Sequence, residues 1–130
     1  MANELILIVE DDRNSLILLR DTLAVAGYRT IEADNAEAVL GLAKQHAPQL
    51  VLMDIQLPGL SGIDAFHALR GDEQTRGIPV VAVTASVMDD QKKEIAEAGF
   101  DGFEQKPISV SRLLRLVSAL LTQKAHPRVQ

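Results

Sequence analysis

The chain has 130 residues, a formal net charge of −5 and no cysteine. The missing cysteine excludes disulfides, thiolate metal sites and a cysteine nucleophile, and it fits a cytoplasmic protein. The acidic balance argues against direct contact with nucleic acid, and no apolar run is long enough to cross a membrane. We expect one domain over residues 1–122 and a flexible polar tail over residues 123–130.

Short apolar segments alternate along the chain with segments of helical periodicity. The first, Leu5–Val9, and the third, Leu50–Asp54, are almost continuously apolar, as expected of strands covered on both faces. Further strands are expected over Tyr28–Ala33, Ile78–Val83 and Asp101–Gln105. A helix is expected after each strand, and the last four helices have candidate caps at Asp34, Ser61, Ser86 and Ser109.

Strict alternation of five strands and five helices predicts an α/β fold. Its sheet should be parallel, with helices on both faces and right-handed crossovers. In such a sheet the carboxyl ends of all strands meet at one edge, where ligands and chemistry gather. The side chains expected there are Glu10 and Asp11 after the first strand, Asp54 after the third, Thr84 and Ala85 after the fourth, and Lys106 after the fifth.

Three carboxylates at one edge repel each other unless a cation neutralises them. Oxygen ligands without histidine or cysteine favour a hard divalent ion, and few protein ligands with retained water favour Mg²⁺ over Ca²⁺. A metal, a lysine and a hydroxyl together are suited to phosphoryl transfer, in which a carboxylate can itself be the nucleophile. Asp54 is the candidate for an aspartyl phosphate, because it ends the central strand.

Four motifs in order make the sequence resemble the CheY-like response-regulator receiver domains. The resemblance covers about residues 4–121, and its motifs are Val9-Glu10-Asp11-Asp12, Met53-Asp54-Ile55-Gln56-Leu57-Pro58-Gly59 with Gly62, Val83-Thr84-Ala85, and Phe103-x-x-Lys106-Pro107. Each motif alone is weak, whereas four at successive strand ends are specific. The resemblance implies a flavodoxin-like, doubly wound fold with strand order 2-1-3-4-5.

The resemblance also implies a function for the sheet edge. Asp54 would accept a phosphoryl group from the phosphohistidine of a sensor histidine kinase or a histidine phosphotransfer protein. Mg²⁺, with Mn²⁺ as a second candidate, would be held by Glu10, Asp11, Asp54 and the backbone carbonyl of Gln56. By the same resemblance, Lys106 and the Ala85 backbone would bind the phosphoryl group, Thr84 and Phe103 would act as the switch, and Lys106–Pro107 would be a cis peptide.

Simpler interpretations exist for each residue alone. Glu10 and Asp11 could belong to a solvated turn, Thr84 could be an ordinary strand residue, and Lys106 a surface lysine. Phe103 is by default a core residue of an edge strand, and it lacks the hydroxyl of a tyrosine switch. These interpretations fail jointly, because four separate strand ends would have to supply compatible chemistry by chance.

Two other classes of protein remain as alternatives. One is a pseudo-receiver that binds partners without phosphorylation, which the complete set of site residues opposes. The other is a flavodoxin-like or phosphohydrolase enzyme. Three acids after the first strand would repel a flavin phosphate, and Gln56 stands where a haloacid-dehalogenase-type hydrolase needs a second aspartate.

We therefore expect a stand-alone signal carrier and no turnover enzyme. Its signal would leave by protein contact rather than through nucleic acid or a membrane. The expected surface comprises the fourth helix, the fifth strand and the last helix, because the apolar face of Val87–Ala98 is thin and such a helix shifts at low cost.

Overall fold

A five-stranded parallel sheet forms the centre of the protein in the computed structural model, which describes residues 3–57, 59–85 and 89–125. The strand order is β2-β1-β3-β4-β5. This confirms the predicted doubly wound α/β fold and its order. The strands are β1 (Leu5–Val9), β2 (Arg29–Ala33), β3 (Leu50–Asp54), β4 (Val80–Thr84) and β5 (Gly102–Gln105).

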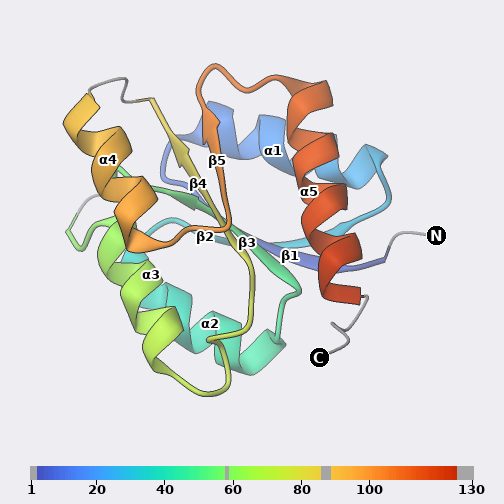
Figure 1. Cartoon of the computed structure of the whole chain (residues 1–130). Coiled ribbons are helices and arrows are strands. Elements are labelled where there is room, and N and C mark those ends of the chain that lie inside the picture. The colour runs from blue at the N-terminus through green and yellow to red at the C-terminus, as the bar shows by residue number, and fades with distance from the viewer. Residues whose placement is uncertain (1–2, 58, 86–88, 126–130) are drawn as a thin grey trace.

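Helices cover both faces of the sheet (Figure 1). They are α1 (Arg13–Val25), α2 (Val39–His46), α3 (Gly62–Gly71), α4 (Asp89–Ala98) and α5 (Val110–Ala125), with a short 3₁₀ helix at Ala36–Ala38. Helices α1 and α5 lie on one face, and α2, α3 and α4 lie on the other. None of the helices within the described ranges combines the length and the apolar character that a bilayer crossing requires.

The central strands are buried along their whole length. Every residue of β1, β3 and β4 is shielded from solvent, as the continuous apolar runs predicted. Most of their side chains join two hydrophobic clusters, one under α1 and α5 and the other under α2 and α3. Ala82 of β4 belongs to a small third cluster with Ile55 and Ile95. Each buried Leu, Ile or Val contributes about 1.5–3 kcal/mol relative to exposure, so this core holds the strand ends in a fixed relative position.

Several boundaries differ from those expected. Asn35, rather than Asp34, caps the 3₁₀ helix that precedes α2, because Asn35 has the extended backbone of a cap and its Oδ1 accepts a hydrogen bond from Ala38 N at 2.9 Å. Helix α2 itself begins after Ala38 without a side-chain cap. Ser61 forms the expected capping box with Asp64. The predicted cap at Ser86 lies outside the described residues. Helix α5 continues to Ala125, three residues into the predicted tail, and residues 126–130 also lie outside the described ranges.

The side chains of β5 that face the core are not the ones expected. Phe103 is 38% exposed, whereas the neighbouring Glu104 is buried. Glu104 faces inward because successive side chains alternate across a strand, and its Oε2 pairs with Arg112 Nε of α5 at 2.9 Å. The default prediction of Phe103 as a core residue is therefore wrong. Its ring lies on the surface between β5 and α4.

Candidate functional site

The ends of β1 and β3 bring three acids together. These strands are neighbours in the sheet, with Val9 paired to Met53, so that the residues after them emerge side by side. Glu10 and Asp54 are buried, while Asp11 is exposed. One carboxylate oxygen from each of the three lies within 4.8 Å of the others. The structure thus forms the carboxylate cluster that the strand ends predicted.

Lys106 follows the edge strand β5, and its side chain reaches the same cluster. Its Nζ lies 2.8 Å from Glu10 Oε1 and 3.5 Å from Asp54 Oδ2. Its backbone N–H donates to Thr84 O at 2.8 Å, which fixes the start of the loop after β5 against the end of β4. The Lys106–Pro107 peptide bond is cis. An ammonium therefore faces two carboxylates that solvent barely reaches.

Backbone amides complete the orientation of the acids. Glu10 Oε2 accepts from Asp12 N at 3.1 Å, and Asp54 Oδ1 accepts from Gln56 N at 2.9 Å. The Asp54 side chain is thus held with Oδ1 towards the loop after β3 and Oδ2 towards Lys106. Such charge-assisted bonds are short and directional, so they limit the conformations of both carboxylates.

Burial changes the protonation of this cluster. Burial first, and then the nearby Asp54 carboxylate, raise the pKa of Glu10 from its usual 4.5 to about 7, because together they outweigh the lowering by the Lys106 ammonium and the Asp12 amide. Burial alone would lower the pKa of Lys106, but the carboxylates of Glu10 and Asp54 raise it above its ordinary value. The lysine stays charged at neutral pH, while Glu10 takes up and releases its proton near pH 7.

The cluster fits a hard divalent cation. Its donors are all oxygen, and the Lys106 ammonium offsets only one of the three negative charges. A cation bound by Glu10, Asp11 and Asp54 would relieve the repulsion between the carboxylates.

The other predicted site residues are distributed around this cluster. Thr84 is buried at the end of β4, next to the strand that carries Asp54, and Ala85 follows it on the surface. Gln56 is exposed and lies two residues beyond Asp54. Phe103 stands apart, because it lines a cavity with α4 instead of facing the acids.

Gly62 is a positioning residue that the sequence marks only as part of the motif after the third strand. A Cβ at this position would lie 2.3 Å from Asp54 O and 2.9 Å from Ile55 Cα. The amide of Gly62 also donates to Ile55 O at 3.1 Å. Helix α3 therefore begins directly against the backbone of Asp54, which only a residue without a side chain allows. The glycine was visible in the sequence, but the contact depends on the tertiary fold.

Comparisons with known proteins agree with this geometry. Residues 6–118 match the family of response regulator receiver domains, and the chain belongs to that family. Over 116 residues it is 40% identical to the polar-differentiation response regulator DivK of Brucella anthropi. The match covers 89% of this chain and 94% of that protein. The chain is thus similar to DivK over nearly the whole length of both.

Solved receiver domains have the same fold. The receiver domain of the sensor histidine kinase PA1611 from Pseudomonas aeruginosa superposes with a TM-score of 0.86 at 26% identity, covering 92% of this chain and 98% of that one. That structure has a magnesium ion coordinated in its active-site cleft. A histidine-kinase receiver domain from Syntrophus aciditrophicus gives a TM-score of 0.88 at 27% identity, covering 98% and 97%.

The contact at Gly62 leads to a first prediction. Gly62→Ala should lower the free energy of unfolding by about 1–3 kcal/mol, because its methyl group overlaps the Asp54 backbone. Gly41→Ala is the matched control. Nothing lies within 4 Å of a Cβ at this position in α2, so the change should stabilise the helix by about 0.5–1 kcal/mol. Urea unfolding measures both, and equal stabilities of the two variants would contradict the contact.

The raised pKa of Glu10 leads to a second prediction. Since the folded state holds this proton more tightly than the unfolded state, metal-free protein should lose stability as pH rises from 4.5 towards 7. The loss from this group should be up to about 3 kcal/mol. Glu10→Gln should remove that part of the pH dependence, whereas the exposed Glu97→Gln should retain it. Urea unfolding in EDTA across this pH range decides, and identical slopes for all three proteins would count against a buried, protonatable Glu10.

Proposed function

We propose that this receiver domain accepts a phosphoryl group on Asp54 from a phosphohistidine of a kinase or phosphotransfer protein. The observation that carries the proposal is the Asp54 carboxylate itself, buried at a strand end with Lys106 Nζ 3.5 Å from Oδ2. Glu10 and Asp11 stand beside it. Asp54 would supply the nucleophilic oxygen, Lys106 a positive charge that stabilises the product, and the three carboxylates together the ligands for a metal.

The transfer needs few groups from the protein. An Asp54 carboxylate oxygen attacks the phosphorus in line, a P–O bond forms, the P–N bond breaks, and the histidine nitrogen keeps the electron pair and takes a proton. Bound Mg²⁺ would supply charge neutralisation of the phosphoryl oxygens, held by Glu10, Asp11, Asp54 and the Gln56 carbonyl. Lys106 would exchange one of its carboxylate contacts for a phosphoryl oxygen, and the Thr84 hydroxyl and the Ala85 N–H would bind another.

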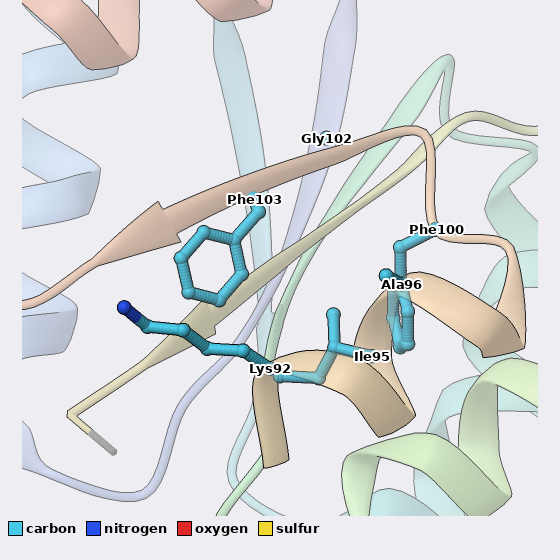
Figure 2. A pocket seen from close by; sticks show the side chains of 6 residues that line it. All are labelled: Lys92, Ile95, Ala96, Phe100, Gly102 and Phe103. Carbon is cyan, nitrogen blue, oxygen red and sulfur yellow. The ribbon is translucent and has the colours of Figure 1, made fainter. Parts of the chain in front are cut away.

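The output surface in this proposal is the face formed by α4, β5 and α5. A cavity of 470 Å³ lies there between α4 and β5. Figure 2 shows its lining residues Lys92, Ile95, Ala96, Phe100, Gly102 and Phe103, with the Phe103 ring beside the Lys92 side chain. An apolar hollow next to a lysine suits an apolar side chain of a partner protein that also carries an acid.

Phe103 connects this surface to the phosphoacceptor through the backbone. Phe103 pairs with Ala82 of β4, and two residues further along the same strands Gln105 pairs with Thr84. Movement of Thr84 towards a phosphoryl group would therefore reach Phe103 through one strand pair. Because phenylalanine has no hydroxyl, the coupling would act by packing of the ring against α4.

Phosphorylation by a small donor tests the proposal. Incubation with Mg²⁺ and acetyl phosphate should add one phosphoryl group to the protein, read as intact mass, and Asp54→Asn should abolish the gain. Asp21→Asn removes an exposed acid of α1 and should gain the group like the parent. No gain in the parent would overturn the proposal in favour of a pseudo-receiver. A gain that persists in Asp54→Asn would move the acceptor to another residue.

A further inference from the structure

A second cavity lies across the edge strand β2, on the other side of the molecule from the cavity at Phe103. It has a volume of 340 Å³ and is lined by Leu16 of α1, Glu32 and Ala33 of β2, and Asp34, Ala38 and Leu42. Leu16, Ala33, Ala38 and Leu42 form its apolar wall. Glu32 and Asp34 are exposed, so that two carboxylates flank an aliphatic hollow.

This combination matches a long basic side chain. Arginine and lysine bury an aliphatic stem along apolar surface and keep their charge at the edge, where a carboxylate can meet it. The volume is at the lower end of ligand pockets, which suits one side chain better than a larger molecule. An acidic side chain would meet two like charges here, and a purely apolar one would leave both carboxylates facing it.

The chain already places one guanidinium at this edge. Arg20 Nη1 lies 3.5 Å from Glu32 Oε2, and Arg20 Nε lies 3.5 Å from Asp21 Oδ1. Arg20 and Glu32 are both partly exposed, so the pair contributes little to stability and can be exchanged. Glu32 therefore pairs with an arginine, but the pair is weak enough for a partner's cation to replace it.

The cavity also adjoins the phosphoacceptor site. Ala33 O accepts the backbone N–H of Glu10 at 2.9 Å, so a wall residue of the cavity is bonded directly to the first acid of the cluster. The ends of β2, β1 and β3 lie in that order along one edge of the sheet. A protein that delivers a phosphoryl group to Asp54 must bind over this edge, and a side chain of that protein can then enter the neighbouring cavity.

We propose that the phosphodonor protein docks by inserting an arginine or lysine side chain into the cavity between Leu16, Ala33 and Leu42, with its charge on Glu32 and Asp34. This inference rests on the proposed function, because it assumes a protein donor for Asp54. It assigns Glu32 and Asp34 to recognition of the donor and leaves the chemistry at Asp54 unchanged.

Transfer kinetics test the inference. The probes are the purified histidine kinases of the organism that encodes this chain, autophosphorylated with ATP, and its histidine phosphotransfer proteins, phosphorylated by those kinases. Acetyl phosphate serves as the small donor. For the fastest protein donor, Glu32→Gln/Asp34→Asn should raise KM about tenfold and leave kcat unchanged, as expected for two weak ion pairs. Added salt should raise KM more in the parent than in the variant. The matched control Asp21→Asn/Glu73→Gln makes the same charge change on exposed residues outside the cavity lining and should keep the parent KM.

Each outcome decides between the two proposals. Unchanged acetyl-phosphate labelling with a raised KM for the protein donor supports docking at the cavity. A parent-like KM in the double variant overturns the inference, while the proposed function stands. Labelling by acetyl phosphate but by no protein donor also overturns it, because the cavity then has no donor to receive. Absence of labelling by any donor in the parent overturns the proposed function itself.

Discussion

The rest of the site depends on two buried carboxylates that share one ammonium. Lys106 Nζ lies 2.8 Å from Glu10 and 3.5 Å from Asp54, in a place that water barely reaches. Removing such charges from water is costly, and one lysine compensates for the acids only in part. The raised pKa of Glu10 is the sign of this imbalance. A site with excess negative charge suits a divalent cation, which would offset that charge.

The fold keeps this arrangement from relaxing. A carboxylate cluster in a flexible loop would separate its charges, but here the acids follow strands that are buried on both faces. Gly62 brings the start of α3 against the backbone of Asp54, and the amide of Gln56 holds its Oδ1. The hydrophobic core of the sheet therefore holds a few polar atoms in an unfavourable proximity, which is a common arrangement at functional sites.

Sequence reasoning was strongest where a pattern is local. The unbroken apolar runs of β1 and β3 predicted buried strands, and their acidic ends predicted the cluster. It was weaker where tertiary packing decides. The short β5 has too few residues to show from sequence which of its side chains face the core. The prediction therefore places Phe103 in the core, whereas Glu104 is the buried residue and pairs with Arg112. The cavity beside Glu32 depends on how α1 and α2 flank an edge strand, and no single segment shows it.

Proton release on magnesium binding tests the charge imbalance most directly. Mg²⁺ requires ionised carboxylates, and Glu10 with a pKa of about 7 is partly protonated at neutral pH. Calorimetric titration with MgCl₂ at pH 7, in two buffers of different ionisation enthalpy, should therefore show a net release of protons on binding. Magnesium binding with no proton released between pH 6 and pH 8, or no binding at all, would contradict the account.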